Sequence, residues 1–256
     1  MKLGLLDADF LLFYVTQGNK VLDENGEPLK ESGKFVYTPK EFSQVCADAD
    51  NFIEQILIKT ESTHYLGFLG NGKNFRYDVF PQYKANRTQP KPEHFRELKN
   101  YLAEKWKFNL VEGIEADDAV VILKNSLKDC FLISPDKDIL KCIEGTHFNP
   151  RVNEWVETSF RAANYNFWCS MIAGDSTDGI KGIPGKGIKY AETLLGDAEF
   201  YPDKVLTAYI DLFPTGHQGI KEFYKNYSLL KILDEPEYSF NPTDYQPIEF
   251  KPEKLF

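Results

Sequence analysis

Short apolar runs alternate with stretches of helical periodicity along the first half of the chain. Residues 2–6, 64–69 and 129–134 are apolar runs of strand length. Between them, apolar positions recur at helical spacing over residues 42–57 and 115–125. Strands that alternate with helices predict an α/β fold, with a mostly parallel central sheet and flanking helices.

The other segments divide the chain into two regions. Thr38 is expected to cap the helix that follows it, since a proline comes next and a glutamate stands three residues on. Residues 19–34 are polar and contain glycine, so we expect a loop or an exposed hairpin there. After about residue 155 the pattern is helical. We therefore predict an α/β core over 1–155 and an integrated helical region over 156–256.

Composition excludes several classes of protein. With 256 residues, 42% of them hydrophobic, the chain can bury a real core, and no apolar run approaches the length of a membrane span. The first ten residues carry charge within their apolar run, which favours a strand over a signal peptide. The four cysteines form no CxxC pair, so we expect free thiols in the cytoplasm and no zinc site.

Charge is unevenly distributed. The formal net charge is −9, which by itself argues against nucleic acid as a partner. Residues 73–107, however, hold nine Lys and Arg against four Asp and Glu. The chain could therefore present a basic, phosphate-facing side and an acidic site elsewhere. A solvated, charged helix would explain the same composition.

Carboxylates stand where the predicted strands end and where helices begin. The carboxyl ends of parallel strands meet at one edge of a sheet, so acids from separate segments could gather there. Such a cluster repels itself unless cations neutralise it, and carboxylate oxygens select Mg²⁺ or Mn²⁺. A pair of these ions is the usual machinery for phosphodiester hydrolysis. The candidate metal ligands are Asp7, Glu115, Asp117, Asp118, Asp136, Asp138, Asp175 and Asp178.

Each acidic group also has a purely structural explanation. EADD (115–118) could complement a helix dipole, and DKD (136–138) could form a turn. Asp175 and Asp178 could cap a helix. Asp7 is the most informative acid, because a carboxylate that ends a buried strand is costly without partners.

Residues 172–189, IAGDSTDGIKGIPGKGIK, combine two acids with a glycine-rich loop. A nucleotide-binding P-loop is excluded. If Gly185 and Lys186 were the Gly-Lys of that motif, it would also require a glycine at position 180, which is Ile180, and a Ser or Thr at position 187, which is Gly187. The loop therefore needs another explanation for its glycines.

Four motifs together resemble the 5′-nuclease superfamily, which includes flap endonucleases and 5′→3′ exonucleases. They are YKANR (83–87), GIEADD (113–118), SPDKD (134–138) and GDSTDGIKGIPGKG (174–187). The short chain and YKANR look most like the small bacteriophage 5′→3′ exonucleases. The resemblance implies a nuclease core, a helical arch over about 83–107, and a C-terminal helix–hairpin–helix that holds a duplex phosphate, with K⁺ as a further ion.

The resemblance also implies roles for particular residues. Lys84 and Arg87 match the basic residues at the base of the arch and are the expected catalytic pair. A lysine beside two metal ions would stabilise charge on the scissile phosphate. The expected DNA contacts are Arg96 and Lys99 in the arch, and Gly182, Gly185, Lys186, Gly187 and Lys189 at the hairpin, where glycine permits close backbone approach.

One stretch departs from the family pattern. The family commonly has an aspartate after its second core strand, whereas here the nearest candidate is the neutral Asn71 in GFLGNGKNFR. An amide is a poorer ligand for a hard cation, so Asn71 is not assigned as a ligand. Phe10, Phe13 and Tyr14 could stack on an unpaired base, but their spacing fits a buried helix face and we predict that they are core.

Taken together, these features predict a Mg²⁺-dependent 5′→3′ exonuclease or flap endonuclease acting on DNA through two metal ions. The expected partner is DNA with a 5′ end or flap, or an RNA–DNA hybrid, and not a membrane. A monomer in the cytoplasm is expected, in the host cytoplasm if the chain is phage-encoded. The alternatives are a DNA-binding protein with impaired catalysis, a ribonuclease with a similar acidic sheet edge, and a nucleotide phosphohydrolase.

Overall fold

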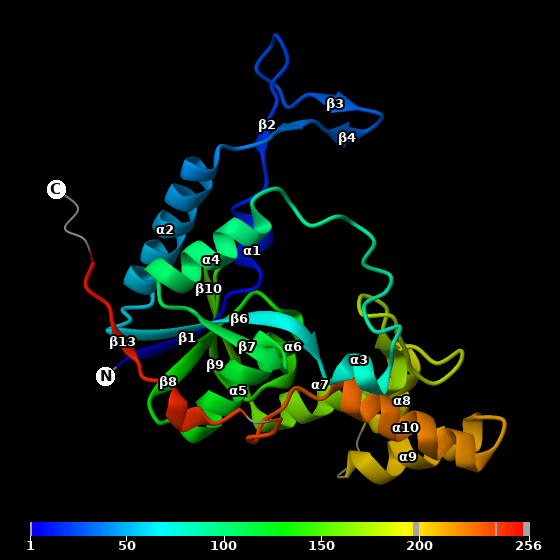
Figure 1. Cartoon of the computed structure of the whole chain (residues 1–256). Helices are drawn as coiled ribbons and strands as arrows, with labels where there is room; N and C mark the ends of the chain where they lie inside the picture. The colour runs from blue at the N-terminus through cyan, green and yellow to red at the C-terminus, as the bar shows by residue number, and fades with distance from the viewer. Residues whose placement is uncertain (1, 197–199, 239, 253–256) are drawn as a thin grey trace.

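A mostly parallel sheet forms the centre of the protein (Figure 1). The computed structural model describes residues 2–196, 200–238 and 240–252. The sheet has the order β10-β9-β8-β1-β6-β13, and β7 also pairs with β6. Its strands are β1 (Leu3–Asp7), β6 (His64–Asn74), β7 (Asn109–Gly113), β8 (Cys130–Ile133), β9 (Gly145–Asn149), β10 (Glu154–Thr158) and β13 (Ile248–Glu249).

Strand direction confirms the predicted fold class. β1 runs parallel to β6 and β8, β8 runs parallel to β9, and β6 runs parallel to β7. β10 and β13 are antiparallel additions. The sequence pattern missed both, since β10 is mostly exposed and β13 has two residues.

Helices cover both faces of the sheet. They are α1 (Leu11–Tyr14), α2 (Phe42–Lys59), α3 (Arg76–Val79), α4 (Phe95–Lys105), α5 (Ala116–Ser126) and α6 (Lys137–Cys142). Side chains alternate across β1, so Leu6 packs with α2 and α4 while Leu3 and Leu5 pack with α5 on the other face. Burial on both faces explains why the strands read as continuous apolar runs.

The helical region after residue 158 has a hydrophobic cluster of its own, built around Trp168, Tyr209 and Phe223. Its helices are α7 (Phe160–Ala173), α8 (Ile188–Leu195), α9 (Tyr201–Leu212) and α10 (Gly216–Leu230), and a short 3₁₀ helix, η1 (Pro242–Asp244), follows. The glycine-rich stretch joins α7 to α8 and contains a small antiparallel pair, β11 (Gly174–Asp175) and β12 (Ile180–Lys181). The division near residue 155 stays a prediction.

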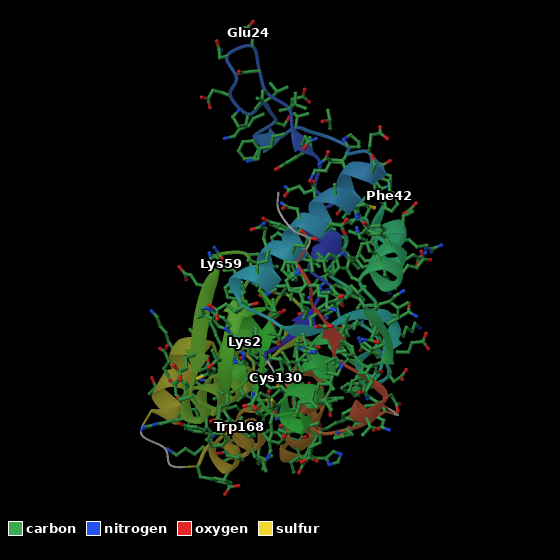
Figure 2. The ribbon with its side chains drawn as sticks, turned by 90° about the vertical axis from the view of Figure 1, so that its left-hand side faces the viewer. Lys2, Glu24, Phe42, Lys59, Cys130 and Trp168 are labelled. Carbon is green, nitrogen blue, oxygen red and sulfur yellow. The ribbon has the colours of Figure 1, made fainter. Side chains whose placement is uncertain are left out.

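A narrow finger projects from the body between α1 and α2. It contains β2 (Asn19–Lys20), β3 (Lys30–Glu31), β4 (Lys34–Phe35) and β5 (Tyr37–Thr38), and Glu24 lies at its far end (Figure 2). The expected cap at Thr38 is wrong, because Thr38 pairs with Asn19 in the finger and α2 begins at Phe42, with Glu41 as its N-cap.

The predicted helical arch is helical only in its second half. Residues 80–94 form turns and extended chain that connect α3 to α4 (Figure 1). α4 itself belongs to the core, since Leu98 and Leu102 are fully buried beside α2. The prolines at 81, 90 and 92 explain why this connection is not a helix.

Two absences bear on the predicted class of protein. No helix in the part of the chain that the structure describes is long and apolar enough to cross a membrane. All four cysteines are free thiols, as the sequence predicted.

Candidate active site

Acidic side chains from four segments line one cavity of about 400 Å³ at the carboxyl edge of the sheet. They are Asp7, Asp9, Glu115, Asp117, Asp136, Asp138, Asp175 and Asp178. Seven of them are predicted metal ligands. Asp9 was not predicted, and Asp118, which was, does not line the cavity.

Local structure fixes several of these carboxylates. Asp7 ends β1 with only 8% of its surface exposed, and the Ser134 hydroxyl donates to its Oδ2 at 2.9 Å. Asp136 is the N-cap of α6, where its Oδ1 accepts a hydrogen bond of 2.7 Å from the backbone N–H of Asp138. Asp175 lies in β11 at the start of the glycine-rich loop. Strand ends and a helix cap therefore aim the acids into one space.

The YKANR motif covers this cavity with basic groups. Lys84 Nζ lies 2.5 Å from Glu115 Oε1 and 3.7 Å from Asp178 Oδ2. Arg87 also pairs with Asp178, and the Tyr83 hydroxyl donates to both carboxylates at 3.0 Å. Both predicted catalytic residues therefore lie directly against predicted metal ligands.

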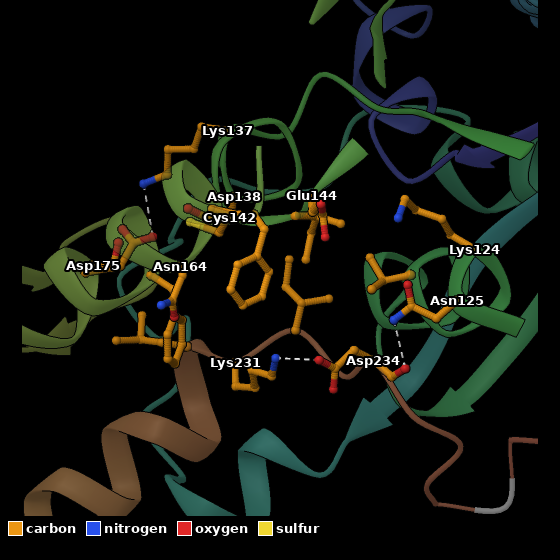
Figure 3. Close-up of a pocket in the computed structure, with 18 of the residues that line it drawn as sticks. Lys124, Asn125, Lys137, Asp138, Cys142, Glu144, Asn164, Asp175, Lys231 and Asp234 are labelled. Carbon is orange, nitrogen blue, oxygen red and sulfur yellow. Dashed lines mark hydrogen bonds and ion pairs between the residues drawn. The ribbon is translucent and has the colours of Figure 1, made fainter. Parts of the chain in front are cut away.

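A third basic side chain, Lys137, holds Asp175, with Nζ 3.0 Å from Oδ2 (Figure 3). Lys137, Asp138 and Asp175 also border a second cavity of about 240 Å³ behind the acids, whose far side carries the ion pair of Lys231 and Asp234. Lys137 therefore stands in the wall between the two cavities.

Negative charge exceeds what these bases neutralise. Burial, together with repulsion from Asp9, raises the pKa of Asp7 to about 7, and burial with repulsion from Asp136 raises the pKa of Asp138 to about 6. Burial also raises the pKa of Asp117 well above its ordinary value. These carboxylates therefore lack sufficient counter-charge, which a bound cation would supply.

The donor set fits a hard divalent cation. Eight carboxylates and five basic side chains line the cavity, and carboxylate oxygens are ligands that Mg²⁺ and Mn²⁺ prefer. Within residues 2–196, 200–238 and 240–252, no three Asp, Glu, His or Cys side chains are already spaced to hold one ion. Lysine and arginine pairs occupy several of the carboxylates instead.

Asp118 has a structural role rather than the predicted one. It is fully buried and pairs with Arg76 through two hydrogen bonds of 2.6 and 2.8 Å. It also completes a capping box with Glu115 at the start of α5. All of its lone pairs are directed into the fold, so we leave Asp118 out of the metal ligands.

Asn71 is not among the residues that line the acidic cavity. Its Nδ2 donates to Glu112 at 2.8 Å, and its Oδ1 accepts from Lys99 at 3.1 Å. Lys99 also donates to the backbone carbonyl of Gly70, so it is held against β6 rather than free in the arch. Arg96, by contrast, is exposed on α4.

The hairpin glycines differ in what surrounds them. A Cβ on Gly182 would lie 2.1 Å from the carbonyl oxygen of Ile172, so the fold itself requires glycine there. Gly185 and Gly187 have open space beside them, with Gly185 at a φ of +70°. Lys189 is exposed, and Lys186 lies 4.5 Å from the ring centre of Tyr190. Whether these residues contact DNA stays a prediction.

The prediction that the aromatics after β1 are core is wrong for two of the three. Phe13 is 51% exposed and Tyr14 is 42% exposed, whereas Phe10 packs against the core. Phe13 and Phe10 both line the acidic cavity, and Phe13 lies edge-on to Phe95 at 5.3 Å. α1 has only four residues, too few to bury the stripe that the spacing suggested.

Sequence reasoning missed Asp9 and Lys137. A signal for Asp9 was present, because DAD repeats the acid-x-acid spacing of DKD at the end of another strand. Nothing in the sequence predicted the partner of Lys137, since its ion pair joins segments 38 residues apart.

Comparisons with known proteins point to one family. The family model described as the 5′-3′ exonuclease, N-terminal resolvase-like domain, matches residues 38–164. The 5′-3′ exonuclease of Mycoplasmopsis pulmonis is 29% identical over 150 residues, which are 52% of this chain and 50% of that protein. Flap endonuclease Xni of Aeromonas salmonicida is 31% identical over 172 residues, 58% of this chain and 63% of that protein. The matches thus span between half and two thirds of these relatives.

Among solved structures, the bacteriophage T5 flap endonuclease, in a pseudo-enzyme-product complex with DNA and metal ions, superposes with a TM-score of 0.63. That match covers 91% of this chain and 89% of the T5 protein at 17% identity, which supports the fold. The chain belongs to the 5′-3′ exonuclease and flap endonuclease superfamily.

Proposed function

We propose that the chain is a metal-dependent nuclease that hydrolyses phosphodiesters at the 5′ ends or 5′ flaps of DNA. The observation that carries this proposal is the cavity that eight carboxylates line together with Lys84 and Arg87, which pair with two of them. An acidic cavity beside basic groups suits a phosphodiester held between metal ions and cationic side chains. The names of the relatives support the same activity.

Two Mg²⁺ or Mn²⁺ ions would be held, directly or through water, by Asp7, Glu115, Asp117, Asp136, Asp138, Asp175 and Asp178. When bound, such ions supply a deprotonated attacking water and stabilise the leaving oxygen. Lys84 would stabilise the charge that develops on the scissile phosphate, and Arg87 would orient that phosphate. Both side chains are already directed at the cavity by their pairs with Glu115 and Asp178.

DNA would approach along the segment 80–94 on one side and the glycine-rich hairpin on the other. Arg96 is exposed near the first surface, and Lys189 is exposed near the second. The open space beside Gly185 and Gly187 would let a phosphate reach backbone N–H groups, with K⁺ as a further ion. We propose that the chain acts as a monomer and that an RNA strand paired to DNA is a second substrate.

The test is cleavage of a 5′-labelled duplex and of a matched 5′-flap duplex, each with Mg²⁺ and with EDTA. Mononucleotides or short oligomers from the duplex mean an exonuclease, and a single product at the flap junction means a flap endonuclease. Binding in a gel shift without any Mg²⁺-dependent product would overturn the proposal and indicate a DNA-binding protein. Cleavage of single-stranded RNA alone would instead indicate a ribonuclease.

A further inference from the structure

β6 contributes no acidic side chain to the cavity. Its sequence, HYLGFLGNGKN, contains no Asp or Glu, and its Asn71 is bonded to Glu112 and Lys99 outside the cavity. Asn74, nearer the acids, uses both side-chain atoms, donating to Glu115 at 3.0 Å and accepting from the backbone of Arg76 at 3.0 Å. The carboxyl edge of the sheet therefore lacks a ligand where β6 ends.

The carboxylate of Asp9 lies beside β6. The backbone N–H of Gly70, in β6 two residues past the partner of Asp7, donates to Asp9 Oδ1 at 3.0 Å. A Cβ on residue 70 would lie 3.0 Å from Asp9 Oδ2, so the carboxylate occupies the space beside the strand that a side chain on β6 would otherwise fill. Glycine at position 70 gives Asp9 room to reach the strand.

Asp9 also keeps one oxygen free. The Gly70 bond engages Oδ1, and no donor from the described part of the chain reaches Oδ2. Asp9 lines the same cavity as Asp7 and Glu115. Asp7 stands two residues earlier, at the end of β1. A carboxylate oriented through one oxygen with the other open is how proteins hold a ligand ready for a metal ion.

We propose that Asp9 is a metal ligand of this site and supplies, from the turn after β1, the carboxylate that β6 lacks. This inference rests on the proposed function, because it names a further ligand of the same site. It gives the chain eight candidate ligand carboxylates although Asp118 is directed into the fold. The alternative is that Asp9 only ties the end of β1 to β6 through the Gly70 bond.

The test is the binding of Mn²⁺ to the full chain, measured by calorimetry and by electron paramagnetic resonance without DNA. Asp9→Asn keeps an oxygen that can accept from Gly70 but removes the charge. We expect this variant to bind one of two Mn²⁺ ions at least about ten-fold more weakly than the wild type. The matched control is Glu112→Gln, which removes an exposed acid at the same sheet edge outside the cavity and should bind both ions normally.

A second variant distinguishes the loss of a metal ligand from a folding defect. Asp9→Ala/Gly70→Asp moves the carboxylate to β6, where removal of the Asp9 side chain leaves space for it. If Asp9 is a ligand, this double variant recovers Mn²⁺ affinity that Asp9→Ala alone has lost. Equal Mn²⁺ binding by the wild type and Asp9→Asn would overturn the inference and leave the proposed function standing. A wild-type chain that binds no Mn²⁺ would contradict the proposed function as well.

Discussion

Arg76 and Asp118 form a buried ion pair with hydrogen bonds of 2.6 and 2.8 Å, although the sequence predicted Asp118 to be a metal ligand. Arg76 is 2% exposed, and it also donates to the backbone carbonyls of Leu229 at 3.1 Å and Lys231 at 2.9 Å. Asp118 accepts from the backbone N–H of Leu233 at 2.9 Å. This ion pair therefore joins α3 and α5 to the end of α10 and the residues that follow it. It holds the helical region against α5.

Breaking this pair should destabilise the fold. Arg76→Met leaves the Asp118 carboxylate buried without its partner, so we expect the free energy of unfolding to fall by about 3–5 kcal/mol in urea titration. Glu222→Gln, which breaks the surface pair with Lys225, is the control and should cost about 1 kcal/mol or less. A loss for Arg76→Met no larger than the control would contradict the role assigned to the pair.

A substitution at Asp136 should separate the loss of a metal ligand from a loss of folding. Asn is also a good N-cap, so Asp136→Asn should preserve α6 while removing one carboxylate from the cavity. We expect Mg²⁺-dependent cleavage to fall by at least about 100-fold. DNA affinity in a gel shift with Ca²⁺ should change by less than about three-fold, because the proposed DNA contacts at Arg96 and at the glycine-rich hairpin lie elsewhere. Wild-type turnover would remove Asp136 from the ligand set.

Phe13 should contribute to substrate binding. Its ring is 51% exposed, lines the acidic cavity and lies edge-on to Phe95, so an unpaired base could stack on it. Phe13→Ala should weaken binding of a duplex with an unpaired 5′ nucleotide by about 1–3 kcal/mol, measured by fluorescence anisotropy. Phe200→Ala is the control, since Phe200 is 62% exposed and is not among the residues that line the cavity. Equal affinities for both variants would rule out stacking at Phe13.

His147 should make stability depend on pH. Its ring is fully buried, its Nε2 donates to the carbonyl of Ile143 at 2.7 Å, and burial lowers its pKa below 6.5. As the pH falls below about 6.5, the unfolded chain takes up a proton at this histidine that the folded chain does not, so stability is lost toward acid. His147→Gln should make the slope of unfolding free energy against pH less positive between about pH 5 and pH 7, whereas exposed His217→Gln should leave that slope as in the wild type.

Sequence patterns predicted those features that local spacing determines. Apolar runs marked β1, β6 and β8, and the geometry of a parallel sheet then placed Asp7 and Asp136 at one edge. The catalytic assignment of Lys84 came from a motif, and the structure places its ammonium group 2.5 Å from Glu115.

Features that depend on partners distant in the chain were not predictable. Asp117 and Asp118 are neighbours in one acidic run, yet only Asp117 faces the cavity, because Arg76, 42 residues earlier, holds Asp118. Asp9 was overlooked because its significance depends on a glycine 61 residues away. Thr38 has every local feature of a cap, and the strand that it forms with Asn19 overrides them.

Two glycines of the hairpin should separate folding from DNA binding. Gly182→Ala places a Cβ 2.1 Å from the carbonyl oxygen of Ile172 and 2.5 Å from the backbone nitrogen of Gly174, so we expect a lower melting temperature. Gly187 has a φ of −112°, which any residue can adopt, and a Cβ there meets nothing within 4 Å. Gly187→Ala should therefore keep the wild-type melting temperature. If a phosphate approaches this backbone, the same substitution should weaken duplex binding by up to about ten-fold, the value of one hydrogen bond. Affinity and melting temperature both unchanged in Gly187→Ala would mean that DNA does not reach the backbone at this position.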